Sequence, residues 1–142
     1  MLEKLRAFFE RSVPLTDEQF ELIKSLFVPK KFKKGEFLLR EGEMTHYTIF
    51  VASGCLRTYT IDHDGKEHIL QFSPENWWTG DMSFKSNVPS QCFIEALEDS
   101  EVLLTEILRW KNYMKVFRRW ELFTKGPCRK VWHQRINTLL PL

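Results

Sequence analysis

A glycine followed by an acid, Gly80-Asp81, begins a polar stretch that interrupts a chain of short alternating apolar segments. The next residues, Met82 to Lys85, are predicted to form one helical turn. Free N–H groups at the start of a helical turn attract anions, phosphate above all. The glycine would give the backbone a φ that other residues avoid, and would allow it to approach another group closely. These residues predict a loop that holds a small anionic ligand, whereas a plain connection between two strands is the simpler alternative.

The composition is that of one soluble globular domain. The chain has 142 residues, of which 43% are hydrophobic and 28% charged, with a net charge of +2. From Ile107 onward nine Lys or Arg stand against one acid, a balance of +8, so residues 1–106 carry −6. Such a division is typical of a nucleic-acid or membrane contact, or of a solvated basic helix face.

The cysteines and the N-terminus indicate a cellular compartment. Cys55, Cys92 and Cys128 are widely separated and form no C-x-x-C pair, which argues against a zinc site or a disulfide framework and favours a reducing environment. The N-terminus mixes charged residues among its apolar ones, which is not the pattern of a secretory signal. No apolar run reaches the roughly 18 residues of a membrane span. We therefore expect a cytoplasmic protein that makes no membrane contact.

Apolar periodicity divides the chain into three parts. Helical spacing predicts two helices within residues 1–28, the second beginning at a capping box of Thr16 and Gln19, running to about Phe27 and ending before Pro29. Over residues 31–107 the period changes to two, which predicts short strands. These strands are expected at about 37–40, 47–53, 55–61, 66–72, 91–96 and 101–107, with an edge strand beginning near 31. Helical spacing returns over residues 108–142.

Turn chemistry and the last helix complete the expected architecture. The stretch from Asp62 to Gly65 predicts a β-hairpin, because Asp-Gly supplies the positive φ of a tight turn. Six or more short strands at this spacing predict a mainly β fold with flanking α-helices, either a sandwich or a jelly-roll barrel. The last helix, at about 127–140, is expected to carry a stripe that pairs with a second helix or folds back on the barrel. That stripe consists of Cys128, Val131, Trp132, Arg135 and Leu139.

The ordered glycines, together with the two leading helices and the hairpin, resemble a known family. Gly35-Glu36, Gly42, Gly54, Gly65 and Gly80-Asp81 follow the intervals of the cyclic-nucleotide-binding domain of the Crp/Fnr family of bacterial transcription regulators. The resemblance covers about residues 2–140. It implies one domain over 1–142, folded as a double-stranded β-helix or jelly-roll barrel, that senses a ligand, forms a homodimer through its C-terminal helix and is not an enzyme. The family adds a helix-turn-helix domain after that helix, so DNA binding is expected only of a longer form.

The resemblance also identifies a phosphate-binding cassette, here the cassette segment, residues 80–92. The family has a Gly-Glu pair, a short helix and an Arg eleven residues after the Gly. In this chain Asp81 replaces the Glu, and Gln91, followed by Cys92, stands in place of the Arg. Since Gln has no charge, the charge-assisted contact of the arginine is lost. This removes on the order of 1.5–3 kcal/mol of binding energy. We expect a degenerate site for cAMP, cGMP or another small anion. Its expected lining is Gly80, Asp81, Met82, Ser83, Gln91, Cys92 and Leu70.

Two other classes of protein stay open. A stand-alone dimerisation or interaction module would use the last helix and bind no small ligand. A cupin-type metalloenzyme needs a His-x-His pair, which the four histidines do not form, so no metal ligand and no catalytic residue are expected. Beside the loop, Trp77-Trp78 could stack on a purine or seal a core or an interface.

Overall fold

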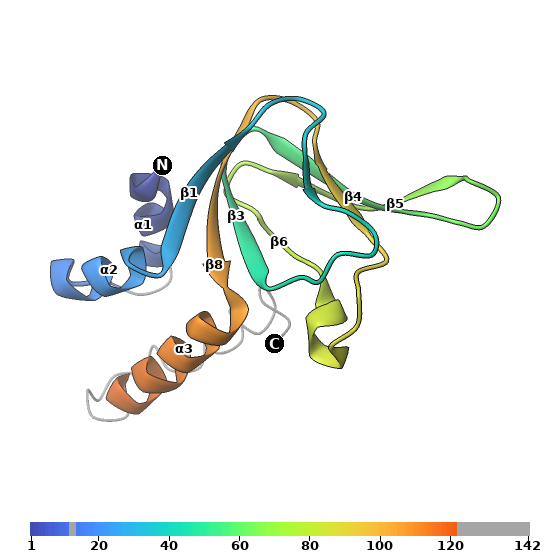
Figure 1. Cartoon of the computed structure of the whole chain (residues 1–142). Helices are drawn as coiled ribbons and strands as arrows, with labels where there is room; N and C mark the ends of the chain where they lie inside the picture. Colours follow the sequence, from blue (N-terminus) through green and yellow to red (C-terminus); the bar gives the residue numbers. More distant parts are fainter. Residues whose placement is uncertain (12–13, 122–142) are drawn as a thin grey trace.

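The computed structural model describes residues 1–11 and 14–121 (Figure 1). The helix predicted over 127–140, with its stripe of Cys128, Val131, Trp132, Arg135 and Leu139, lies outside the described residues. The elements follow one another in this order: α1 Leu2–Glu10, α2 Asp17–Lys24, β1 Phe27–Phe32, β2 Phe37–Leu39, β3 Tyr47–Ser53, β4 Cys55–Ile61, β5 Glu67–Pro74, β6 Trp78–Thr79, the 3-10 helix η1 Met82–Ser86, β7 Phe93–Ala96, β8 Ser100–Glu106 and α3 Ile107–Glu121.

The strands form two four-stranded antiparallel sheets that enclose a β-roll. One sheet has the order β1-β8-β3-β6 and the other the order β2-β7-β4-β5. Their facing sides share an aliphatic core, which consists of Leu39, Ile49, Val51, Leu56, Ile94, Ala96 and Val102. The predicted fold class, mainly β with flanking helices in a jelly roll, is confirmed.

A second, aromatic core fills the space between the first sheet and the helices. Trp78 of β6 and Trp110 of α3 lie with ring centroids 6.2 Å apart, and Phe27 of β1 contacts both rings. Phe9 of α1 packs against the same two indoles. Trp110 is only 1% exposed. Because aromatic side chains bury large areas, this cluster fixes α1 and α3 against the outer face of the first sheet.

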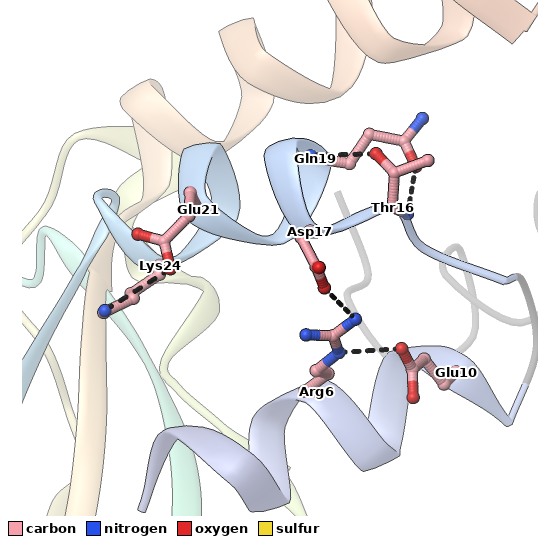
Figure 2. Close-up of polar contacts among 7 residues, drawn as sticks. All are labelled: Arg6, Glu10, Thr16, Asp17, Gln19, Glu21 and Lys24. Atoms are coloured by element: carbon pink, nitrogen blue, oxygen red, sulfur yellow. Dashed lines mark hydrogen bonds and ion pairs between the residues drawn. The ribbon is translucent and has the colours of Figure 1, made fainter.

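The two N-terminal helices are held by side-chain contacts that the sequence partly predicted (Figure 2). Gln19 N donates to Thr16 Oγ1 at 3.2 Å, and Thr16 N donates to Gln19 Oε1 at 2.9 Å, which confirms the capping box. Arg6 of α1 bonds to Asp17 at the start of α2 at 2.7 Å, and to Glu10 at 2.8 Å. Of these contacts, the exposed Arg6–Asp17 pair joins α1 to the start of α2.

The boundary between α2 and β1 differs from the prediction. The helix ends at Lys24 instead of Phe27, and β1 already begins at Phe27 and runs through Pro29. The strand tolerates a proline because β1 lies at the edge of its sheet and pairs only with β8. Lys30 and Lys31 are exposed on the same strand, and lysines on an edge strand oppose pairing with another chain.

The β4–β5 hairpin extends beyond the roll, as Figure 1 shows on the right. Its turn has Gly65 at φ +79°, as the Asp-Gly signal predicted. Asp62 Oδ1 accepts hydrogen bonds from the N–H groups of Asp64 and Lys66, and Asp62 Oδ2 lies 2.7 Å from His68 Nε2. One carboxylate therefore organises the whole turn.

Candidate functional site

The cassette segment begins with a carboxylate that bonds to its own helical turn. Residues Met82–Ser86 form η1, as the predicted turn required, and Asp81 is its N-cap. Ser83 Oγ donates to Asp81 Oδ2 at 2.5 Å, and Ser83 N donates to Asp81 Oδ1 at 3.4 Å. Asp81 and Ser83 are both partly buried. A negative side chain thus stands where the start of a helical turn offers its donors.

Gly80 does not use the conformational freedom expected of it. Its φ is not in the left-handed region, unlike that of Gly35, Gly42, Gly54 and Gly65. A Cβ atom at Gly80 would lie 3.6 Å from Tyr47 O and 3.7 Å from Thr48 Cα, which is ordinary contact. The expectation of a special φ was therefore wrong, and β3 leaves room for a Cβ atom at this position.

The far end of the cassette segment is tied to the turn between β2 and β3. Gly42 N donates to Ser90 O, and Ser90 N donates to Glu43 O, both at 2.8 Å. Cys92 N donates to Ser90 Oγ at 3.0 Å instead of to a neighbouring strand, which is why β7 begins at Phe93 and not at Gln91. Gln91 is exposed and makes no hydrogen bond to any described residue.

Two carboxylates act on the thiol near the end of the cassette segment. Burial raises the pKa of the Cys92 thiol above its usual range, and the negative charges of Asp81 and then Glu41 raise it further. Charges of this sign favour the neutral form of an acid beside them.

Hydroxyl and amide groups line the roll next to the cassette segment, and they are not among the residues predicted from the sequence. Thr79, which directly precedes Gly80, lies with its Oγ1 3.4 Å from Thr58 Oγ1 and accepts at its carbonyl from Thr48 Oγ1 at 3.3 Å. Gln71 Nε2 donates to Ser73 Oγ at 3.0 Å and to Trp78 O at 3.3 Å. Polar residues at inward positions of alternating strands, such as Thr58 two residues after Leu56, are the signal that could have found them.

Other residues that the sequence singled out lie elsewhere. Leu70 is 59% exposed at the register shift between β4 and β5, so it is not part of the barrel core. Trp78 is buried in the aromatic core, whereas Trp77 is 52% exposed. The side chain of Met82 is not described. The structure therefore brings Gly80, Asp81 and Ser83 together and places Leu70 on the outside of the hairpin.

Helix α3 contacts the cassette segment directly. The Lys111 ammonium lies 4.9 Å from the centroid of the Phe84 ring on η1, within reach of a cation–π interaction. The start of α3 is fixed, because Ile107 N donates to His46 O at 2.9 Å and Trp110 is buried. Lys111 thus connects η1 with the first turns of α3, whose start Ile107 and Trp110 hold in place.

Among residues 1–11 and 14–121, no three His, Cys, Asp or Glu side chains are grouped to hold a metal ion. Within the same part of the chain, no helix is long and apolar enough to span a membrane.

A shallow groove of about 370 Å³ lies between α1, α2 and β1, away from the cassette segment. It is lined by Leu2, Glu21, Lys24, Ser25, Phe27 and Pro29.

The roll, the cassette segment and the following helix define a protein of the cyclic-nucleotide-binding class. The family described as "Cyclic nucleotide-binding domain" matches residues 29–115, and the chain belongs to this family. The resemblance to the corresponding domain of the Crp/Fnr regulators is confirmed. The match includes the cassette segment and the first part of α3.

Three relatives show how far the similarity extends. The anaerobic regulatory protein of Bacillus subtilis (strain 168) is 25% identical over 91 residues, which are 63% of this chain and 38% of that protein. The sensor domain of the transcriptional regulator DNR from Pseudomonas aeruginosa is 22% identical with a TM-score of 0.70, and 95% of this chain covers 90% of that one. For the catabolite activator protein of Thermus thermophilus the identity is 22%, the TM-score 0.61, and the coverage 87% of this chain and 56% of that one. The chain thus spans well under half of the curated relative, and the two structures show a shared fold.

Proposed function

We propose that residues 1–142 form one ligand-sensing effector domain of the Crp/Fnr type, regulatory rather than catalytic, that acts in the cytoplasm. The observation that carries this proposal is the contact between η1 and α3 through Phe84 and Lys111. A sensor needs its ligand loop to touch the element that leads to an output, and this contact supplies that connection.

The mechanism that we propose is a shift between two conformations. A ligand that contacts the cassette segment and the hydroxyl groups of Thr58 and Thr79 would favour one position of η1. Since Lys111 lies over the Phe84 ring, that position biases the orientation of α3. A ligand shifts such an equilibrium only by its difference in affinity for the two states.

A cyclic nucleotide would meet Gln91 instead of an arginine, and two carboxylates near Cys92. We expect isothermal titration of the whole chain with cAMP and cGMP to give millimolar binding or none, and Gln91→Arg to increase the affinity. Micromolar binding by the unchanged chain would show instead that the cassette is intact.

The sensing role is tested separately from the identity of the ligand. Hydrogen exchange of Ile107–Glu121 should change on saturation with any ligand that protects η1, and Lys111→Gln should weaken this response while leaving the affinity within a few-fold. Protection of η1 without a response in α3 would contradict the sensing role.

We also propose a homodimer formed through the C-terminal stripe of Cys128, Val131, Trp132, Arg135 and Leu139, with DNA as a partner only of a longer form. Sedimentation at two concentrations should show a dimer that dissociates in the Trp132→Glu variant. A monomer at both concentrations would exclude the homodimer.

A second candidate function is an interaction module without a small ligand. The observation in its favour is the apolar surface of the protruding hairpin, where Ile69, Leu70 and Phe72 are 50%, 59% and 51% exposed on the edge strand β5. Exposed apolar side chains on an edge strand often mark a protein contact. This second function would be favoured if the unchanged chain bound a protein partner that the Leu70→Glu variant does not bind, and if α3 showed no ligand-dependent change.

A further inference from the structure

Three buried side chains of the aromatic core have a polar atom without a partner. Trp78 Nε1, Trp110 Nε1 and Thr105 Oγ1 make no hydrogen bond to any residue that the structure describes. The three residues are only 7%, 1% and 1% exposed. A buried indole N–H or hydroxyl group normally has a partner, because its removal from bulk water without one destabilises the fold. These three groups therefore require a partner that the described residues do not supply.

The three side chains come from three elements that meet over the centre of the first sheet. The strand order β1-β8-β3-β6 puts Phe27 and Trp78 on opposite edge strands, yet their ring centroids are 5.9 Å apart, so the rings meet above the central strands. Thr105 lies there, on β8, directly opposite Phe27, and residues directly opposite in an antiparallel pair share one face of the sheet. The Trp110 ring of α3 lies 5.4 Å from the Phe27 ring and 6.2 Å from the Trp78 ring. Both indoles and the hydroxyl thus surround one place in the core.

The chemistry of the three groups specifies the kind of molecule that can join them. An indole N–H group only donates, so the two indoles cannot bond to each other, whereas the hydroxyl of Thr105 can donate or accept. One water molecule can accept from Trp78 and Trp110 and donate to Thr105. Buried waters typically make about three hydrogen bonds of this kind. The aromatic core has no ionised side chain that would favour an ion instead.

The place is next to a hollow that opens to solvent. Phe27, whose ring contacts both indoles, also lines the groove between α1, α2 and β1. A water molecule in the core would therefore have a short path to bulk solvent.

We propose that Trp78, Trp110 and Thr105 form a binding site for one buried water molecule, which joins β6, β8 and α3. Apolar packing has no preferred direction, whereas hydrogen bonds do, so the water fixes the orientation of the Trp110 indole and with it the start of α3. The site lies on the helix side of the first sheet, among the residues of the aromatic core, and not inside the roll. The proposal therefore does not rest on the sensing function.

The first test is the sign of a stability change at Thr105, measured by urea denaturation of the full chain. Thr105→Val replaces the hydroxyl by a methyl group of similar size. If the hydroxyl bonds to the water, this variant leaves a buried polar group without its partner, and the equilibrium constant for unfolding should rise at least about fivefold. If the hydroxyl has no partner, Thr105→Val removes an unsatisfied group and stabilises the protein. A variant as stable as the unchanged chain, or more stable, overturns the proposal.

A matched pair of variants controls for the shape of the side chain. Thr105→Ser keeps the hydroxyl without the methyl group, and Thr105→Ala lacks both. The Ser variant should be the more stable of the two, by a factor similar to that between Thr and Val. An Ala variant as stable as the Ser variant, or more stable, would contradict the site even if Thr105→Val destabilises the protein.

The second test identifies the bridging molecule as water and includes the indoles. Nuclear Overhauser contacts between water and the indole N–H protons are measured by NMR in the unchanged chain, with the signals assigned through their contacts to the Phe27 ring. Trp77, which is 52% exposed, is the control for free exchange with bulk solvent. The indole protons of Trp78 and Trp110 should both contact water while exchanging far more slowly than that of Trp77. A lack of this contact at either indole overturns the proposal. Because neither test adds a ligand, failure here leaves the proposed sensing function as it stands.

Discussion

Gly54 and Ser100 lie in direct contact at the corner where the chain passes from β3 in one sheet to β4 in the other. Gly54 has φ +93°, and a Cβ atom there would come within 2.2 Å of Ser100 Oγ and 2.8 Å of Ser100 Cα. Ser100 is 2% exposed, and its Oγ accepts from Cys55 N at 3.3 Å and donates to Glu98 O at 2.8 Å. The chain thus passes between the two sheets at a position, Gly54, where no side chain fits.

Gly54→Ala should destabilise the fold strongly. The positive φ costs roughly 1–2 kcal/mol, and the clash with the Ser100 backbone adds about 1–3 kcal/mol. Gly35→Ala is the control, because Gly35 has φ +85° but nothing within 4 Å of the added atom, so only the backbone strain applies. Urea denaturation of both variants measures the difference. Equal losses in the two variants would show that the contact with Ser100 relaxes without cost.

Arg57 should contribute to stability by joining three strands. Its Nη2 lies 2.8 Å from Glu95 Oε2 on β7, its Nη1 lies 3.1 Å from Glu67 Oε2 on β5, and its guanidinium lies 4.2 Å from the centroid of the Tyr59 ring. The Arg57 and Glu95 side chains are only 20% and 18% exposed. Arg57→Ala leaves Glu95 partly buried and unpaired, so we expect a loss of about 1–3 kcal/mol in the free energy of unfolding.

An exposed ion pair provides the comparison for Arg57. Lys31 lies 3.2 Å from Glu101, with 77% and 38% of the two side chains exposed. Lys31→Ala should change the free energy of unfolding by less than about 1 kcal/mol, because surface ion pairs are weak. If Arg57→Ala costs no more than Lys31→Ala, the network between the three strands contributes nothing beyond a surface contact.

Local signals in the sequence predicted much of the fold. The alternation in Tyr47–Ser53 and Cys55–Ile61 gave the bounds of β3 and β4, and the capping box of Thr16 and Gln19 gave the start of α2. Errors arose where distant contacts decide. The helical pattern predicted that α2 continues to about Phe27, but the pairing of Phe27–Phe32 with β8, where Phe27 faces Thr105, makes this segment a strand. Propensity is overridden by such tertiary pairing.

The candidate site was harder to predict than the fold, because side-chain direction decides it. The bulge at Leu70 reverses the alternation of β5, and nothing in the letters EHILQFSP marks a bulge at that position. The self-capping of Asp81 by way of Ser83 depends on a rotamer, which spacing does not encode. Thr58 and Thr79 belong to different sheets, so their contact required the roll to be assembled.

The thiol of Cys92 should report the negative charge of Asp81. Because that charge helps to raise the pKa of Cys92, Asp81→Asn should lower this pKa, increase the thiolate fraction at pH 8 and accelerate modification by a disulfide reagent. The measurement uses a chain in which Cys92 is the only cysteine. A chain with only Cys55 is the control, since burial and then Glu98 raise the pKa of that thiol. An unchanged rate at Cys92, or an equal increase at Cys55, would contradict an acidic field centred on residue 81.

Asp62 should make the stability of the hairpin depend on pH in the acid range. Its hydrogen bonds with His68 and with the N–H groups of Lys66 and Asp64 lower its pKa below the ordinary 3.8. A lowered folded-state pKa means that the stabilisation is complete above 3.8 and is lost as pH falls through the folded-state value. The wild-type chain should therefore exceed Asp62→Asn in unfolding free energy at pH 6, and the difference should shrink once the pH falls below 3.8. Asp64→Asn removes an acid from the same turn but keeps the Asp62 contacts, so it should retain the wild-type profile. A difference between wild type and Asp62→Asn that stays constant down to pH 2 would show that the turn does not depend on the charge of Asp62.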